Sequence, residues 1–301
     1  MIRAIIAGLL ASTAVSVGGP ATVAATVPIG GQACGMTAAG RYLYADSYAL
    51  GTLAKVNPAT NRVVKRIRVG ENPCGIAAGA GALWIEDWTG NAIVRVDVRR
   101  FRVTNRIRVG HKPWDVAFGF GSVWASNQAD GTVSRIDPRS RKIVKTIDTG
   151  GSPTCLRAGL GAIWVGSQFA DDVYRIDPAT NAVQAVRVGN GSALCVDPQP
   201  DGIWVVDNTA SSVTELDPTT HAVVRTIAVD QNPTDAVRGP DGLEWVTGRA
   251  AGTVSRIDPA SGKVVDTIAT GGRPFVIRPG FGDVWTADFS GTSLWRLHPS
   301  S

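Results

Sequence analysis

Long apolar runs are absent from this 301-residue chain after its first 17 residues, which excludes a protein with several membrane-spanning helices. Charged residues make up only 18%, and a formal net charge of +5 lacks the concentration expected of a dedicated nucleic-acid binder. Neither a collagen repeat nor coiled-coil heptads occur. Hydrophobic residues reach 44%, enough for a sizeable core, so the body of the chain is not disordered.

Histidine is also scarce, since the chain has only His111, His221 and His298. No Ser-His-Asp set, phosphate-binding loop or HExxH motif accompanies them. His221 belongs to an outer hairpin, His298 lies near the C-terminus, and His111 stands alone in a turn. We therefore predict no catalytic residues, no cofactor and no metal. An eliminase or lactonase that uses carboxylates and a metal stays open.

The first 25 residues resemble a secretory signal peptide. Arg3 provides a positive start, Ala4 to Val17 is apolar, and residues 22–25 are small enough for a signal peptidase to cut near Ala25. The alternatives are a buried helix or a lipoprotein anchored at Cys34, but Cys34 lies well beyond the apolar run. We predict a signal peptide over 1–25, a single folded domain over 26–301, and a secreted or periplasmic location.

The rest of the chain repeats one unit of about 40 residues. A tryptophan marks each unit from the second onward, and Tyr44 takes the same place in the first; the tryptophans are Trp84, Trp124, Trp164, Trp204, Trp245 and Trp285. Each unit holds four short runs rich in Val, Ile and Trp, separated by Gly-x-x-Pro and Asp-Pro turns. The repeated tryptophan is expected to pack between units.

This pattern predicts an all-β, seven-bladed β-propeller. The last unit ends at its third strand, Leu294 to Leu297, while an unpaired strand, Thr26 to Gly30, precedes the first unit. We expect the N-terminal strand to complete the last blade and so close the ring, which hides the edges that an open sheet would expose.

Basic residues recur at two places in the repeat. Arg95, Arg135, Arg175 and Arg256 each stand two residues before an Asp-Pro or equivalent corner, so the simplest expectation is a local ion pair on one strand face. The outer strands carry Lys65, Arg66, Arg68, Arg106 and Arg108. These are expected to be solvated edge protection, with contact to an acidic polymer as the minor alternative.

Four cysteines open the innermost strands and fall into two pairs of adjacent units. Cys34 and Cys74 lie 40 residues apart, and so do Cys155 and Cys195. An even count in an exported chain favours disulfides, and we predict Cys34–Cys74 and Cys155–Cys195. Equivalent positions in a rotational repeat point the same way, so buried reduced thiols remain the alternative. A four-cysteine metal site is disfavoured because no CxxC spacing exists.

The repeats resemble two groups of known propellers. The stretches Pro240 to Val246 and Val254 to Gly262, with the Gly-x-x-Pro turns, are similar to the virginiamycin B lyase (streptogramin lyase) family and to YVTN-repeat propellers. The resemblance runs from Val27 to His298 and implies the fold. It also implies a magnesium-dependent eliminase that opens a cyclic depsipeptide at its ester, with His after the turn proline and Glu ligands before it and three residues past the blade tryptophan.

The positions that the lyase family would use do not hold these residues. The places after the proline hold no His: they are Cys34, Cys74, Trp114, Thr154, Leu194, Thr234 and Phe275. The places before it hold no acid: they are Gln32, Asn72, Lys112, Ser152, Ser192, Asn232 and Arg273. Three past the tryptophan, only Asp87, Asp207 and Asp288 are acidic. We infer that the general base is missing and that the chain does not carry that lyase chemistry.

The expected binding face is the one formed by the loops between second and third strands and by the turns between blades. Aromatic side chains gather there, namely Tyr48, Trp88, Trp114, Phe169, Phe275 and Phe289, among the charged residues Glu86, Asp87, Asp115, Asp207, Asp235, Asp288, Arg249 and Arg273. Aromatics among mixed charges on a rigid ring suit recognition of a peptide, glycan or protein. We expect Trp88, Trp114 and Phe289 to contribute most.

Two function classes follow. The first is an exported recognition scaffold without chemistry for a peptide, glycan or protein, monomeric and with no nucleic-acid partner. The second is a metal-assisted lyase or lactonase in which Asp87, Asp207 and Asp288 converge on one ion near the channel mouth.

Overall fold

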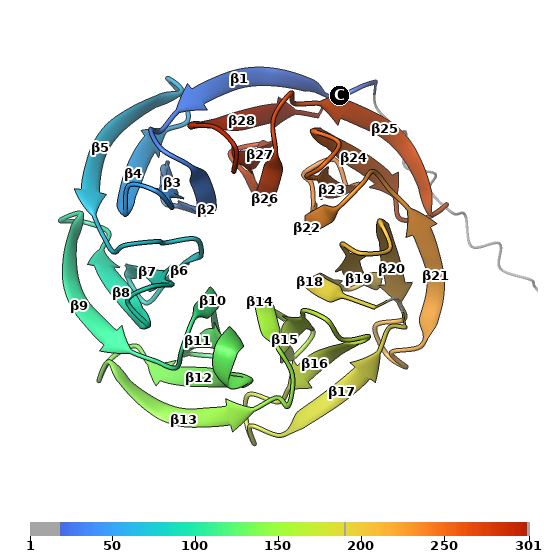
Figure 1. Ribbon diagram of the computed structural model, residues 1–301. Coiled ribbons are helices and arrows are strands. Elements are labelled where there is room, and N and C mark those ends of the chain that lie inside the picture. The colour runs from blue at the N-terminus through green and yellow to red at the C-terminus, as the bar shows by residue number, and fades with distance from the viewer. Residues whose placement is uncertain (1–18, 190, 300–301) are drawn as a thin grey trace, which may run out of the picture.

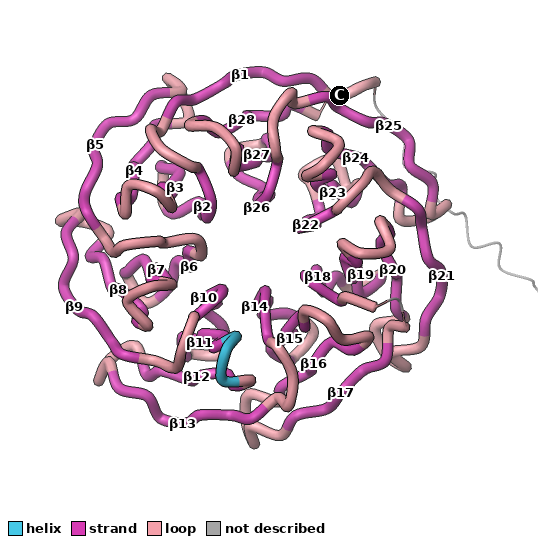
Figure 2. Tube along the Cα trace, in the orientation of Figure 1, coloured by secondary structure: helices cyan, strands magenta, loops and turns pink. Residues whose placement is uncertain are grey.

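The computed structural model describes residues 19–189 and 191–299, and the predicted signal peptide lies largely outside them. Twisted antiparallel sheets stand around a central axis like the blades of a propeller (Figure 1). Loops and turns join the strands, and the one helix of the described residues is a single 3-10 turn, Gln128–Asp130 (Figure 2). No helix in this part of the chain is long and apolar enough to cross a membrane.

Each blade is a meander in which the first strand is innermost and the fourth lies at the outer rim. The strands are β1 (Thr22–Pro28); β2 (Ala33–Ala39), β3 (Tyr42–Ser47), β4 (Thr52–Asn57), β5 (Arg62–Arg68); β6 (Ile76–Gly79), β7 (Ala82–Asp87), β8 (Ala92–Asp97), β9 (Arg102–Arg108); β10 (Pro113–Gly119), β11 (Ser122–Asn127), β12 (Thr132–Asp137), β13 (Lys142–Asp148); β14 (Pro153–Gly159), β15 (Ala162–Ser167), β16 (Asp172–Ile176), β17 (Val183–Arg187); β18 (Ala193–Gln199), β19 (Gly202–Asp207), β20 (Ser212–Leu216), β21 (Val223–Ala228); β22 (Pro233–Arg238), β23 (Glu244–Gly248), β24 (Thr253–Asp258), β25 (Lys263–Ala269); β26 (Pro274–Gly280), β27 (Asp283–Asp288) and β28 (Ser293–His298).

Five of the sheets have four strands, and one has eight. The larger sheet consists of the β14–β17 and β18–β21 units, which a single pair between Ser167 and Ala193 joins. The fold is thus all-β, as the sequence predicts, and its strands are consistent with about seven blades. Each blade is a hydrophobic layer packed on its neighbours, so the core forms a ring rather than one central cluster.

The N-terminal strand closes the ring by pairing with the last strand of the chain. The order in that sheet is β1-β28-β27-β26, with Thr22 opposite His298 and Pro28 opposite Ser293. The strand begins at Thr22, four residues before the start that the sequence predicts. The segment before it also packs, because the Ala21 amide donates to Asp266 at 2.8 Å and Arg256 donates to the Gly19 carbonyl at 3.1 Å.

A chain that starts at Thr26 is expected to be less stable than one that starts at Gly19, both with an initiator Met. The shorter chain loses the outer half of β1 and uncovers the buried Arg256, whose interactions include the Gly19 carbonyl. We expect a loss of about 2 kcal/mol, or roughly 4–8 °C in the unfolding midpoint, measured by calorimetry. Equal midpoints for the two chains would show that residues 19–25 contribute nothing.

The repeated aromatic residues are fully buried, as expected. Tyr44 and each blade tryptophan are 0% exposed, and the indole Nε1 of Trp84, Trp124 and Trp164 donates to a glycine carbonyl five residues earlier. A buried indole N–H needs an acceptor, and this bond supplies it within the same hairpin. The tryptophans therefore belong to the framework and are unavailable to a ligand.

The expected ion pairs within the Arg-x-Asp corners do not form among the described residues. The corner aspartates instead cap their own turns; Asp137, for example, accepts from the Arg139 amide at 2.8 Å. Arg95, Arg135 and Arg256 instead lie over the tryptophans of their own blades. Arg135 is 4.7 Å from the Trp124 ring centroid and donates to the Pro178 carbonyl at 2.7 Å. The local prediction was wrong because backbone amides of the turn occupy the carboxylate.

Both predicted disulfides are present, and no cysteine is free. Cys34–Cys74 joins the innermost segments of the β2–β5 and β6–β9 blades, with a Cα–Cα distance of 4.8 Å. Cys155–Cys195 joins β14 to β18, with a Cα–Cα distance of 5.0 Å. The inner strands converge on the axis closely enough for the thiols to meet. Two disulfides are consistent with an extracellular or other oxidising compartment.

Candidate binding site

Five of the predicted aromatic side chains surround one cavity on the loop face. Trp88 and Trp114 are in edge contact at 5.4 Å between ring centroids, and Phe289 lies 5.8 Å from Tyr48 and 5.0 Å from Phe275. The cavity between them has a volume of about 120 Å³. All five are partly buried, so each keeps some ring surface exposed. The space suits one small ring or aliphatic group of a larger ligand.

The local chain path explains how these rings meet. Trp114 and Phe275 follow the inter-blade prolines at the starts of β10 and β26, whereas Tyr48, Trp88 and Phe289 stand directly after β3, β7 and β27. Both kinds of position lie on the same face of the propeller, the one formed by the loops between second and third strands and by the turns between blades. Cys74 also lines the cavity, so the Cys34–Cys74 disulfide fixes two of the blades beneath it.

Glu86 contributes a carboxyl group to the lining of this cavity. The side chain is 0% exposed, and neither of its oxygens has a hydrogen-bond partner that meets normal geometry. Burial raises the pKa of Glu86 well above its ordinary value, and the nearby Asp46 raises it further. The group is therefore held toward its neutral form, in which it can donate a hydrogen bond to a ligand.

Replacing Glu86 by Gln should flatten the fall of stability with rising pH. Because the folded-state pKa is raised, the native protein binds this proton more tightly than the unfolded chain, so stability declines as pH climbs above the ordinary value of 4.5. We expect Glu86→Gln to recover on the order of 1–2 kcal/mol at pH 8 and almost nothing at pH 4. Denaturant unfolding at both pH values measures this, with the exposed Glu71→Gln as the control; an equal effect at both pH values would contradict it.

Ion pairs link inner strands of the propeller near the aromatic cavity. Arg157 of β14 donates to Asp115 of β10 at 3.1 Å and to Asp235 of β22, across the channel, at 2.8 Å. Arg278 of β26 also pairs with Asp235. The Asp235 carboxylate additionally accepts the backbone amides of Ala236 and Ile277. Asp115 and Asp235, predicted as binding residues, thus tie inner strands of four blades together.

Burial and partner charges oppose each other in this network. Burial by itself would lower the pKa of Arg157, but the carboxylates of Asp235 and Asp115 outweigh it and the pKa is raised. Burial and the charge of Arg157 lower the pKa of Arg278. The two arginines therefore depend on Asp115 and Asp235 for compensation of their buried charge.

Three cations at the aromatic rim have no carboxylate partner among the described residues. Arg249 lies 5.1 Å from the ring centroids of both Phe275 and Phe289, and Lys112 lies 5.7 Å from that of Trp88. Arg273 is exposed beside Arg249, and burial together with its charge lowers the pKa of Arg249. The rim therefore combines aromatic surface with unneutralised positive charge, which suits an acceptor-rich ligand.

The three aspartates expected near the channel mouth are separate loop caps. Asp87 accepts the Glu71 amide at 3.0 Å, Asp207 accepts the Thr209 and Ala210 amides at 2.9 and 2.8 Å, and Asp288 accepts the Ser290 amide at 3.0 Å. Each holds its own loop to the adjacent chain. The described residues contain no group of three or more His, Cys, Asp or Glu side chains placed to hold a metal ion.

The remaining candidates lie apart from the cavity. Phe169 is 81% exposed and does not line it. His111 pairs with Asp130 at 2.8 Å and His298 with Asp283 at 2.6 Å, while His221 lies 5.3 Å from the Trp164 ring. The histidines are therefore far apart in the fold and engaged by framework residues.

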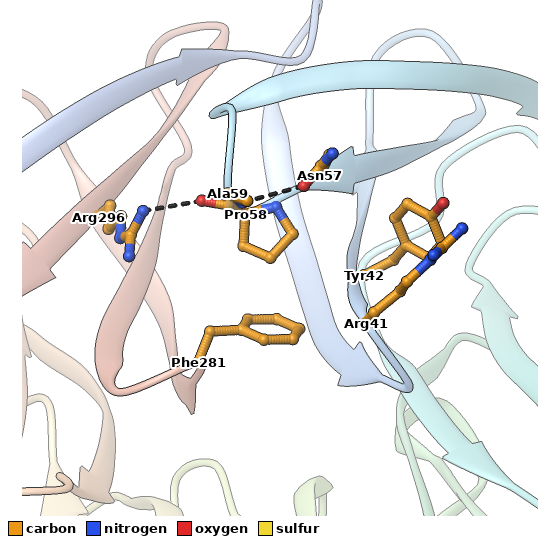
Figure 3. Close-up of a pocket in the computed structure, with 7 residues that line it drawn as sticks. All are labelled: Arg41, Tyr42, Asn57, Pro58, Ala59, Phe281 and Arg296. Carbon is orange, nitrogen blue, oxygen red and sulfur yellow. Dashed lines mark hydrogen bonds between the residues drawn. The ribbon is translucent and has the colours of Figure 1, made fainter.

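A larger but more open cavity lies between β28, the β26–β27 turn and the first blade (Figure 3). Its volume is about 610 Å³, and Arg41, Tyr42, Pro58, Phe281 and Arg296 are among its lining. Arg296 is already engaged, since it pairs with Asp283 and donates to the Pro58 carbonyl at 2.8 Å. None of its lining residues has a buried side-chain oxygen or nitrogen without a hydrogen-bond partner, whereas Glu86 in the aromatic cavity has two such oxygens.

Sequence reasoning missed the network in the channel, although a signal was present. Asp115 and Asp235 both stand two residues after an inter-blade proline, and Arg157 and Arg278 both follow the next blade's first buried aliphatic residue. This repeated Asp-then-Arg relationship between consecutive blades is the pattern that would have indicated it.

Comparisons with known proteins identify the fold. No family model matches the chain, and no curated protein sequence matches it. Among solved structures, the chain is similar to a catalytically inactive virginiamycin B lyase from Staphylococcus aureus with quinupristin, at a TM-score of 0.80, 12% identity, and coverage of 91% of this chain and 98% of that one. It is also similar to the Myceliophteria thermophila Cps50 (Swd1) propeller domain, at a TM-score of 0.78 and 11% identity over 92% and 99% of the two chains.

A third similar structure is hydrazine synthase of Kuenenia stuttgartiensis, at a TM-score of 0.75 and 15% identity over 87% and 93% of the two chains. The chain is a β-propeller. Identities this low support the fold and leave the activity to the site itself, because propellers with unrelated functions share the same framework.

Proposed function

We propose that this propeller is an exported, non-catalytic recognition module that holds an apolar group of a peptide or glycan ligand in the aromatic cavity. The observation that carries the proposal is the convergence of Tyr48, Trp88, Trp114, Phe275 and Phe289 on one cavity. Aromatic anchors in a preformed pocket provide most of the binding energy in such interfaces. The unpaired rim cations Lys112, Arg249 and Arg273 favour a ligand that carries hydrogen-bond acceptors or a carboxylate.

The proposal is tested with Trp88→Ala and its matched control Phe169→Ala. Phe169 is an aromatic residue of the same face that lies outside the cavity. Linear and cyclic peptide arrays and a glycan array identify a ligand, and its affinity is then measured by tryptophan fluorescence and calorimetry. We expect Trp88→Ala to weaken binding roughly 30-fold and Phe169→Ala to leave it unchanged. Equal losses for the two variants, or no binder in either array, would oppose the proposal.

The lyase alternative rests on the fold likeness and needs its own test. Quinupristin incubated with the protein and magnesium is followed by mass spectrometry for ring opening. We expect no product, because the positions matching the family's histidines hold other residues and Asp87, Asp207 and Asp288 are engaged by backbone amides. Enzyme-dependent turnover would overturn the non-catalytic proposal.

Export is proposed on the apolar N-terminal segment together with the two disulfides. We expect the leader to be cut before Thr22 rather than near Ala25, since a cut at Ala25 would remove residues that pair with β28. The mass of the mature protein from an exported fraction tests this. We also propose that the mature protein is a monomer, because pairing of β1 with β28 completes the last blade and leaves no missing strand for a second molecule to supply.

A further inference from the structure

The outer strands of three consecutive blades form a basic belt that the proposed function does not use. We define this basic belt as the exposed Lys and Arg side chains of β5, β9 and β13. β5 carries four such residues, β9 three and β13 two; they are Arg62, Lys65, Arg66, Arg68, Arg102, Arg106, Arg108, Lys142 and Lys145. The three strands follow one another along one arc of the ring (Figure 1).

The other outer strands of the same molecule provide an internal comparison. β17, β21 and β25 carry one basic residue each, and β1 carries none. These strands occupy the same rim position and are equally exposed edges. Edge protection therefore does not require the charge density of the basic belt. The difference extends to the surrounding sequence: residues 33–148 hold twice as many Lys and Arg as Asp and Glu, whereas acids outnumber bases in residues 149–299.

Most of the basic belt is not neutralised within the molecule. Arg106 pairs with Asp87, and Arg66 donates to the Ile29 carbonyl. The others form no ion pair among the described residues, and Asp148 is the one acidic residue on the three strands. By contrast, Arg187 and Arg225 on β17 and β21 pair with Asp171 and Glu215. Unpaired like charges repel one another, so this surface gains when an external anion approaches.

We propose that the basic belt binds a linear anionic polysaccharide along the rim of the β2–β13 arc. Arginines two residues apart on one strand, such as Arg66 and Arg68, lie about 7 Å apart on the same face and offer forked donors to carboxylate or sulfate groups. The belt has no exposed aromatic ring for base stacking, because Phe101 is buried, and no helix that could enter a groove. Nucleic acid is therefore the disfavoured polyanion.

The experiment compares two charge-matched double variants of the full chain. Arg68→Gln/Arg108→Gln removes two charges from the belt, and Arg187→Gln/Lys263→Gln removes two from outer strands outside it. The probes are heparin, polygalacturonate and a single-stranded oligonucleotide, with affinity measured over a range of salt concentrations. Calorimetric midpoints verify that both variants are folded.

The belt variant is expected to lose at least about tenfold in heparin or polygalacturonate affinity at low salt and to flatten the salt dependence by about two in log–log slope. The control variant should retain both. Equal losses for the two variants, or no polysaccharide binding at low salt, would overturn the proposal, and tighter binding of the oligonucleotide would replace it with nucleic-acid binding. Trp88→Ala should leave polysaccharide binding unchanged. The proposal for the basic belt is therefore tested independently of the proposal for the aromatic cavity.

Discussion

Asp235→Ala is expected to destabilise the protein by about 3–5 kcal/mol, or roughly 10 °C in the unfolding midpoint. The carboxylate is 2% exposed at the residue level and accepts hydrogen bonds from two arginines and two backbone amides. Truncation leaves Arg157 and Arg278 close together in the channel without the charge that offsets their repulsion. The cost of the unpaired cations exceeds the value of the lost bonds.

Asp258→Ala is the matched control, because that aspartate caps an exposed hairpin and costs about 1 kcal/mol or less when removed. Adding Arg278→Met to Asp235→Ala should restore part of the stability, since the double variant removes one orphaned cation. Guanidinium unfolding of the wild type, Asp235→Ala, Arg278→Met and the double variant gives the coupling energy between the two side chains. A loss for Asp235→Ala no larger than that for Asp258→Ala would show that the channel network is dispensable.

Removing both disulfides is expected to cost about 8 kcal/mol, which is comparable to the whole stability of an ordinary domain. Each bond closes a 40-residue loop, and each is worth about 4 kcal/mol when the native geometry is retained. The two bonds lie in different pairs of blades, so their effects should add. The Cys34→Ser/Cys74→Ser and Cys155→Ser/Cys195→Ser variants separate the contributions.

The two pairs should differ in function although they match in stability. Cys74 lines the aromatic cavity beside Trp114 and Phe275, so loss of the Cys34–Cys74 bond should also weaken ligand binding. Loss of Cys155–Cys195 should leave the Trp88–Trp114 edge of the cavity intact. Unfolding midpoints that do not change in either double variant would show that the blades hold their register without covalent links.

Much of the framework was predictable because it repeats. Seven copies of one hydrophobic pattern define the strands, the buried tryptophans and the pairing of Cys34 with Cys74. The closing strand followed from a missing fourth strand in the last unit. The predicted start of β1 is too late because Thr22 to Ala24 are exposed on the outer strand, and no apolar alternation marks them.

The site was only partly predictable because it depends on the conformations of loops from different blades, which decide whether their aromatic side chains meet. The sequence placed six aromatics on one face, but it could not separate the five that meet from Phe169, which stands alone on its loop. It also could not show that Asp87, Asp207 and Asp288 cap turns, because backbone amides carry no sequence signature. The contact between Arg157 and Asp235 crosses the channel between non-adjacent blades, so no local spacing reports it.

The pairing of Thr22 with His298 makes closure of the ring a late kinetic event. β1 is synthesised before every other described strand, yet its partner β28 is the last, so the contact joins nearly opposite ends of the chain and carries a high loop-closure cost. Until β28 emerges, β1 has no partner strand. Once β28 has emerged, it can pair either with β1 of its own chain or with β1 of a second molecule. During refolding at high protein concentration, pairing of β1 with β28 within one chain therefore competes with the same pairing between two chains. Dilution favours the closed monomer.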